Sequence, residues 1–159
     1  MSVRNVILIG YRGCGKTCVG REVAARLGWT FVDTDERIEA QGRSIRQIFE
    51  QEGEPFFRRL ETDVIAEVTR GTEQVIAVGG GAVLSEANRT ALRAAGLCIW
   101  LTAPVAELHR RSLADPRSLA TRPALTPRSG LDEIRHLLAQ REPLYAAMRF
   151  AARRAVSSP

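Results

Sequence analysis

One stretch near the start of the chain restricts the fold more than any other. Residues 10–17 read Gly-Tyr-Arg-Gly-Cys-Gly-Lys-Thr, which fits the pattern G-x-x-x-x-G-K-[ST]. The apolar, mostly β-branched run Val6–Ile9 precedes it, and apolar residues at near-helical spacing follow it up to Gly28. We therefore predict a buried strand, a glycine-rich turn and a helix, which is the context in which such a loop binds phosphate.

Each residue type in this loop has a chemical reason. Glycines let the backbone turn sharply and bring N–H groups against phosphate oxygens, and the helix start adds partial positive charge. Lys16 would place its ammonium at the β- and γ-phosphates, and the Thr17 hydroxyl could ligate Mg²⁺. Lys16 is also the only lysine among 23 basic residues, and a guanidinium does not replace an ammonium in a tight cradle. The alternative reading, a chance glycine-rich turn, does not explain the matching flanks.

Size and composition indicate an ordinary globular chain, with one domain over residues 1–159. No apolar run approaches the roughly 18–20 residues that span a bilayer. The first residues enter a strand without a signal-like apolar region, and the three cysteines form no C-x-x-C pair. We therefore expect a cytoplasmic monomer in a reducing compartment, without a membrane partner.

The net charge of +5 raises the question of nucleic acid. The arginines are scattered and few aromatic residues lie between them, so nucleic-acid binding is not favoured. Arginines that converge on phosphates and on a carboxylate explain part of the excess. His109 and His136 lack metal-ligand spacing and are interpreted as helix-surface residues. Cys14 is interpreted as a small space-filler in the loop rather than a nucleophile.

Strand-like and helical runs alternate along the chain, which predicts a parallel α/β sheet with crossover helices. The expected strands are Val6–Ile9, Thr30–Val32, Val75–Val78 and Leu97–Leu101. A final helix is expected over Leu131–Met148, and Pro143 should bend or restart it. The tail after it, residues 149–159, does not resemble a buried strand.

Two aspartates follow the second expected strand, in Asp33-Thr34-Asp35. Carboxylates at the carboxyl end of a parallel strand face the crevice in which ligands bind. One aspartate could serve a Mg²⁺ shell and the other a substrate hydroxyl. The alternative is a helix N-cap, since Asp and Thr also cap well, and both interpretations can hold at once.

Two further places could bind an anion. Arg58 and Glu61 share a helix face, so Glu61 could orient the guanidinium, although such a pair is often only a surface ion pair. Gly79-Gly80-Gly81 follows the third expected strand, where a ligand could approach the backbone closely. A flexible turn is the alternative there.

The stretch of residues 114–130 has little periodicity and contains three prolines and three arginines. A basic, irregular segment of this length in a compact domain is often a functional lid. Lid closure expels water and brings cations onto a transferring phosphoryl group. A mobile surface loop is the alternative.

Taken together, six motifs in this order resemble the shikimate kinase family over nearly the whole chain to about Tyr145. They are Gly10-x-x-Gly13-x-Gly15-Lys16-Thr17, Asp33-Thr34-Asp35, Glu54-x-x-Phe57-Arg58-x-x-Glu61, Gly79-Gly80-Gly81-Ala82, Arg122-Pro123 and Arg141-x-Pro143-Leu144-Tyr145. The resemblance implies a three-layer α/β/α P-loop kinase fold, with a central parallel sheet of four or five strands, substrate-binding helices and a lid. It also implies transfer of the ATP γ-phosphoryl group to the 3-hydroxyl of shikimate, in the synthesis of chorismate and aromatic amino acids.

The resemblance also implies residue roles. Those expected to bind the nucleotide are Gly13, Cys14, Gly15, Lys16, Thr17, Cys18, Arg117 and Arg122. Those expected to bind shikimate are Asp35, Arg58, Gly79, Gly80, Gly81 and Arg141. Thr17 would ligate Mg²⁺ and Asp33 would hold it through water. Catalysis is assigned to Lys16, Asp35 and Arg122, with Asp35 orienting or deprotonating the attacking hydroxyl.

One departure and two rival readings accompany this resemblance. The family usually continues with a fifth strand and a last helix, whereas this chain ends at Pro159 and residues 149–159 do not match that pattern. The rivals are a P-loop kinase for another small polyol such as gluconate, and a non-catalytic shikimate-binding module. A gluconate kinase would share the loop but would not need Arg58 and Arg141 to converge on a ring carboxylate.

Overall fold

The computed structural model describes residues 3–116, 125, 128 and 130–149. The strands are β1 (Asn5–Ile9), β2 (Thr30–Asp33), β3 (Gln74–Ala77) and β4 (Leu97–Trp100). The helices are α1 (Lys16–Leu27), α2 (Thr34–Glu39), α3 (Ile45–Glu52), α4 (Glu54–Val68), the 3₁₀ turn η1 (Ala82–Leu84), α5 (Glu86–Ala95), α6 (Val105–Ala114) and α8 (Gly130–Met148). Strands and helices therefore alternate as predicted, and boundaries differ by one or two residues.

The four strands form one parallel sheet in the order β2-β3-β1-β4. The chain passes from β1 outward to β2, returns to β3, and then crosses to β4 on the other side of β1. The connections leave β1 and β3 in opposite directions, so a crevice opens at their carboxyl ends. The glycine loop follows β1 and the three glycines follow β3, which places both at this crevice.

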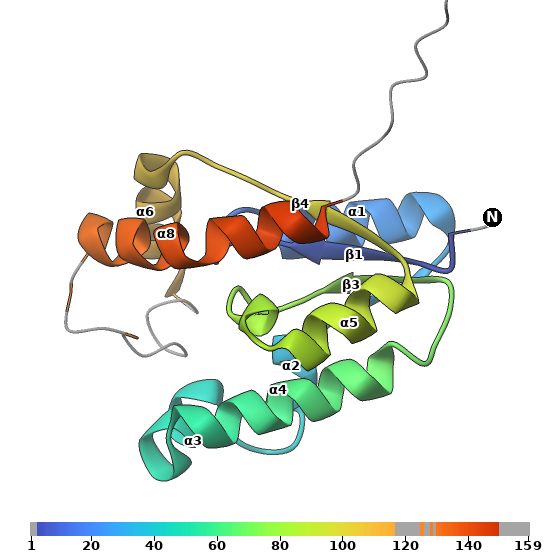
Figure 1. Cartoon of the computed structure of the whole chain (residues 1–159), viewed down its shortest axis with the longest axis horizontal. Helices are drawn as coiled ribbons and strands as arrows, with labels where there is room; N and C mark the ends of the chain where they lie inside the picture. Colours follow the sequence, from blue (N-terminus) through green and yellow to red (C-terminus); the bar gives the residue numbers. More distant parts are fainter. Residues whose placement is uncertain (1–2, 117–124, 126–127, 129, 150–159) are drawn as a thin grey trace, which may run out of the picture.

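Alternating side chains of β1 pack on two sides of the sheet. Val6 and Leu8 pack with Ala24 of α1. Ile7 and Ile9 belong to the larger core, to which α4, α5 and α8 contribute their apolar faces. The sheet is thus covered on both faces, which gives the expected three layers. Figure 1 shows α4 and α5 side by side below the sheet and α6 crossing one end of α8.

Helix α8 continues through Pro143 as one element rather than restarting there. Proline removes the hydrogen bond to the carbonyl four residues earlier, at Ala139. Both residues are exposed, so water can satisfy that carbonyl. No helix in the described part of the chain is long and apolar enough to cross a membrane.

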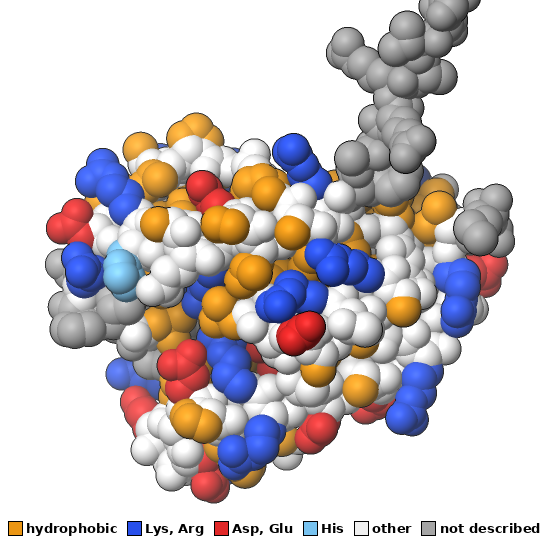
Figure 2. Space-filling model, in the orientation of Figure 1, with side chains coloured by type: hydrophobic (Ala, Val, Ile, Leu, Met, Phe, Trp, Pro, Cys, Tyr) orange, Lys and Arg blue, Asp and Glu red, His pale blue; other side chains and the backbone are white. Residues whose placement is uncertain are grey.

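Charged side chains of both signs are interspersed on the face of the molecule drawn in Figure 2. Many of them form short-range helix pairs, such as Arg26 with Glu22 on α1 and Arg46 with Glu50 on α3. Such exposed pairs contribute little stability. Absence of nucleic-acid and membrane partners stays a prediction.

Candidate active site

The loop between β1 and α1 has the conformation that its glycines permit. Gly13 and Gly15 have φ values of 82° and 100°, in the left-handed region that other residues rarely adopt. The Lys16 ammonium donates to the carbonyls of Gly10 at 2.7 Å and Tyr11 at 3.0 Å. The only lysine of the chain is therefore held over the loop at the start of α1, where helix N–H groups and the helix dipole favour an anion.

Asp33 is the N-cap that one interpretation of its motif expects, and its second carboxylate oxygen faces Thr17. Its Oδ1 accepts from the backbone N–H groups of Asp35, at 2.9 Å, and Glu36, at 3.3 Å, and so caps α2. Its Oδ2 accepts from the Thr17 hydroxyl at 3.0 Å. The cap holds the Asp33 carboxylate beside Thr17 in the first turn of α1. Polar side chains that follow β1 and β2 are therefore in contact at the carboxyl ends of the strands.

The Thr17–Asp33 pair suits a hard cation. Both side chains offer oxygen, the ligand type that Mg²⁺ prefers, and Mg²⁺ commonly uses few protein ligands together with water and substrate phosphates. Among the described residues no group of three or more His, Cys, Asp or Glu side chains forms a metal-binding cluster. The pair therefore fits a metal that is shared with a bound phosphate rather than one caged by protein alone.

Two pockets lie at the crevice and share one wall. The larger is lined by the glycine loop from Arg12 to Cys18 and by Asp33. The smaller lies between α3, α4 and the glycines after β3, and includes Arg58, Glu61 and Arg141. The residues that line both are Arg12, Asp35, Ile45, Gly79 and Gly80. A phosphate-bearing ligand and a second ligand could thus meet at Asp35.

Arg58 of α4 is fixed by two carboxylates within the smaller pocket. Its Nη1 donates to Glu61 at 2.9 Å and its Nη2 donates to Glu54 at 3.2 Å. Glu61 is 1 % exposed, so this is not the ordinary surface pair that the sequence left open. Burial raises the pKa of the Glu61 carboxyl; Arg58 opposes that rise and Asp35 adds to it.

The three glycines after β3 permit close approach by side chains. A Cβ on Gly79 would lie 2.7 Å from Glu61 Oε2 and 3.0 Å from Asp35 Oδ1. One on Gly81 would lie 2.5 Å from the Arg58 guanidinium. Crowding by these side chains, rather than a flexible turn, explains glycine at positions 79 and 81, and close approach by a ligand stays a prediction.

Arg141 brings a second guanidinium to the smaller pocket from α8. It is 4 % exposed, and its guanidinium carbon lies 5.8 Å from the centre of the Tyr11 ring. A buried cation is costly unless an anion or an aromatic face compensates it. Arg58 and Arg141 thus line one pocket from two different helices, as expected for a carboxylate clamp.

Arg12 and Arg111 line the site but were absent from the predicted set. Arg12 is paired with Glu133 of α8 at 3.8 Å and lines both pockets. Arg111 of α6 donates to the Gly13 carbonyl at 3.1 Å. Hydrogen bonds from Arg110 and Arg111 lower the pKa of Glu107 to about 2, so this carboxylate stays charged and orients Arg111.

The remaining predicted residues divide into two groups. Cys14 is buried beside the Lys16 ammonium and Cys18 is exposed, and both line the larger pocket. Arg117 and Arg122 lie outside the described residues. Of the expected lid, residues 114–116, 125, 128 and 130 are described, and the Leu125 N–H donates to Glu133 at 2.9 Å.

Comparison with known proteins identifies the family of this site. The family model for shikimate kinase matches residues 12–158. The chain is 49 % identical over 143 residues to shikimate kinase of Symbiobacterium thermophilum, covering 89 % of this chain and 81 % of that relative. The chain belongs to the shikimate kinase family.

Solved structures of the shikimate kinase family also match the fold. The structure of shikimate kinase from Acinetobacter baumannii in complex with shikimate aligns with a TM-score of 0.87 and 37 % identity, covering 97 % of this chain and 86 % of that one. A gluconokinase from Sinorhizobium meliloti aligns with a TM-score of 0.54 at 18 % identity, which shows a shared fold alone. The family and the fold predicted from the six motifs are thus confirmed.

Proposed function

We propose that this chain transfers the γ-phosphoryl group of ATP to the 3-hydroxyl of shikimate, giving shikimate 3-phosphate and ADP. The observation that carries the proposal is the shared wall between a phosphate-type pocket and a pocket with two arginines, with Asp35 in that wall. Membership of the shikimate kinase family, and the shikimate bound to the Acinetobacter baumannii relative, support the choice of substrates.

In this proposal the glycine loop binds the triphosphate. Backbone N–H groups from Gly13 to Cys18 would surround the phosphates. The Lys16 ammonium would exchange its loop carbonyls for the β- and γ-phosphate oxygens and offset the charge that develops there. Arg111, beside Gly13, lies where it could contact the nucleotide from α6.

The smaller pocket would hold shikimate. Arg58 and Arg141 would bind its carboxylate as two planar forks, with Gly79, Gly80 and Gly81 against the ring. Both guanidinium groups are held in place, Arg58 by its two glutamates and Arg141 against the Tyr11 ring. An acceptor held in one orientation is what phosphoryl transfer needs most.

Asp35 would act on the hydroxyl at the junction of the pockets. Its carboxylate would accept the proton of the 3-hydroxyl as that oxygen bonds to phosphorus. The bond between the γ-phosphorus and the β–γ bridging oxygen breaks, and ADP leaves with its electron pair. Thr17 and Asp33 would hold Mg²⁺, which would neutralise phosphate charge when bound.

Arg117 and Arg122 would bind the nucleotide from the lid at about residues 114–130. Arg122 would contribute a cation to the transferring group, and Arg117 would flank the adenine. A single domain over residues 1–159, a monomeric state and a cytoplasmic location stay predictions, as does the place of the reaction in aromatic amino-acid synthesis.

The deciding experiment is an ADP-release assay with purified protein, ATP and Mg²⁺. We expect release that depends on shikimate, a product mass increased by one phosphoryl group, and no comparable release with gluconate. A preference for gluconate would instead support the polyol-kinase reading. Calorimetric binding of shikimate without turnover would support the non-catalytic reading, and either result would overturn the proposal.

A further inference from the structure

Tyr145 is the last residue of the sixth motif. Neither its position in that motif nor the proposed reaction assigns it a role. It lies on α8 one turn after Arg141 and is fully buried. Its ring packs against Trp100 at the end of β4, with the ring centres 5.8 Å apart. Packing alone would explain an apolar ring here, but it does not explain the hydroxyl.

The hydroxyl of Tyr145 bonds to the loop after β3, beside the clamp arginine. It donates a hydrogen bond to the carbonyl of Gly80. Arg141, one turn earlier on α8, approaches the same glycine, since its Nη1 lies 3.4 Å from the position that a Cβ on Gly80 would take. Burial raises the pKa of the Tyr145 hydroxyl, and the charge of Arg141 opposes that rise. The phenol oxygen therefore holds the glycine loop after β3 beside the guanidinium of Arg141.

The guanidinium of Arg141 lies near two tyrosines. The ring of Tyr11 faces it, and its Nε has no hydrogen-bond partner among the described residues. Unlike Arg58, which two glutamates hold, Arg141 forms no ion pair with a carboxylate in the described part of the chain. Neutral aromatic neighbours leave the charge of Arg141 to an anionic ligand.

The bond to Gly80 has a second effect. The Gly80 carbonyl and the Gly81 N–H belong to one planar peptide unit, so fixing one fixes the other. Glycine has no side chain to restrict that unit, and Gly80 and Gly81 both line the pocket. The Tyr145 hydroxyl therefore sets the orientation of one backbone donor beside the Arg141 guanidinium.

We infer that Tyr145 is a positioning residue for the carboxylate of the acceptor. It acts through the Gly80–Gly81 peptide, which lies beside Arg141, and it does not touch the transferring phosphoryl group. The inference rests on the proposed function, because it names how the same pocket recognises the acid group of shikimate.

The test compares shikimate with its neutral carboxamide in the Tyr145→Phe variant, which keeps the ring and removes the hydroxyl. Losing the hydrogen bond that fixes the Gly80–Gly81 peptide should raise KM for shikimate by about tenfold, with KM for ATP unchanged. KM for the carboxamide should rise less, so the preference for shikimate over the carboxamide should fall. An equal rise in KM for both compounds, or an unchanged KM for shikimate, would overturn the inference.

Trp100→Phe is the matched control for packing. It alters the ring that supports Tyr145 but leaves the hydroxyl and its partner Gly80. We expect a lower melting temperature and an unchanged preference between shikimate and the carboxamide. If Trp100→Phe shifts that preference as much as Tyr145→Phe does, the effect comes from packing and the inference fails.

A second measurement uses the unsubstituted Tyr145 and does not need turnover. The chain has two tyrosines, so incorporation of 3-fluorotyrosine gives two ¹⁹F resonances, which the Tyr11→Phe variant assigns. Saturating shikimate should shift the Tyr145 resonance, and an unmoved resonance would refute the role. A wild-type protein that fails to phosphorylate shikimate would defeat the proposed function instead, so the two failures are distinguishable.

Discussion

In the proposed reaction, nucleotide binding and turnover depend most on Lys16. Lys16→Ala should lower kcat by at least about a hundredfold, because a charge aimed at the developing phosphate charge is removed. Lys16→Arg should not restore activity, since the ammonium fits between two loop carbonyls and a forked guanidinium does not. ADP release gives the rates, and calorimetry should find shikimate binding mostly retained. Loss of shikimate binding with intact ATP binding would contradict the assignment.

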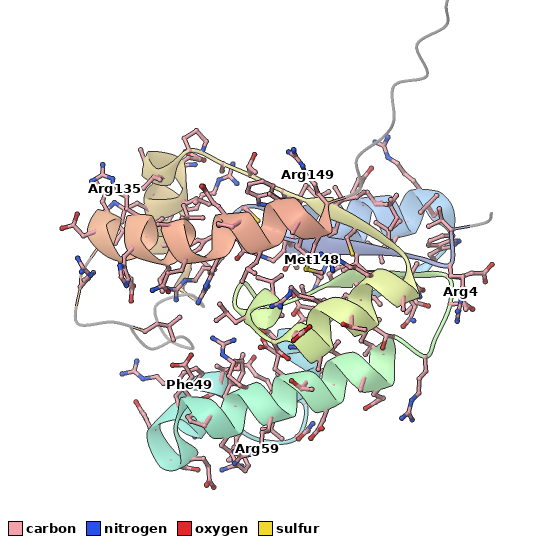
Figure 3. All side chains as sticks on the ribbon, in the orientation of Figure 1. Arg4, Phe49, Arg59, Arg135, Met148 and Arg149 are labelled. Carbon is pink, nitrogen blue, oxygen red and sulfur yellow. The ribbon has the colours of Figure 1, made fainter. Side chains whose placement is uncertain are left out.

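Arg58 is the corresponding residue on the acceptor side. Arg58→Lys keeps a positive charge beside buried Glu61 but loses the fork, so KM for shikimate should rise about tenfold while KM for ATP stays constant. Its neighbour Arg59 is exposed and points away from the sheet in Figure 3, so Arg59→Lys is the matched control. Steady-state kinetics with each substrate varied would test this. Equal effects of the two changes would refute the clamp.

Which residues lie at the crevice could be predicted only where a motif carries them. Lys16, Asp33 and Arg58 stand in recognisable spacings, and the structure places them at one crevice. Arg111 gave no such signal, because its contact with Gly13 spans 98 positions of the chain. Arg12 occupies a variable position of the loop, so nothing in the pattern distinguishes it from a surface arginine. Such contacts are set by the packing of whole helices.

The loop after β3 is a second element with a testable requirement. Gly79→Ala would place a methyl group against the carboxylates of Glu61 and Asp35, so at least one must move. Because small displacements of a reacting group are costly, kcat/KM for shikimate should fall by roughly tenfold to a hundredfold. Kinetics would be measured alongside circular dichroism. A folded variant with full kcat/KM would show that close approach is not needed.

The lid is the element for which the sequence prediction still stands untested. Arg122→Ala should reduce kcat more than it weakens shikimate binding, because a lid cation acts on the transferring group. The contact of Leu125 with Glu133 of α8, which also pairs with Arg12, gives this segment an attachment beside the nucleotide loop. Turnover and calorimetry on the same preparation would measure the effect. An unchanged rate would remove Arg122 from the mechanism.

Elements were more predictable than contacts between them. All four strands follow from apolar runs, and Ser44 and Ser85 cap α3 and α5 as serine before an apolar run suggests. Helix α2 begins at Thr34, directly after β2, because Asp33 supplies its cap. The sheet order cannot be read from periodicity, since it depends on which strands the crossover helices bring together.

At the scale of the whole molecule, the ionisation of buried Glu61 contributes to the pH dependence of the free energy of unfolding. Burial raises the pKa of Glu61 on folding above the ordinary 4.5, so between the unfolded-state and folded-state pKa values the folded state binds more protons than the unfolded chain. The stability of the wild type relative to Glu61→Gln should be greatest below about pH 4.5 and should fall as pH rises through the folded-state pKa. Urea unfolding at a series of pH values measures the difference. The exposed Glu50→Gln variant controls for the loss of one charge, and a difference that grows with pH would contradict the expectation.

The single ε-amino group of the chain lies at the start of α1, where the triphosphate is proposed to bind. Acylation of lysine side chains therefore has one possible target, and every molecule so labelled is labelled at that place. An acyl phosphate of ADP would carry the acyl group to this lysine. The mass of the intact protein would then give the fraction of molecules that are acylated. Because every other lysine or arginine position of this chain is arginine, the unsubstituted protein already has a single lysine that can be labelled.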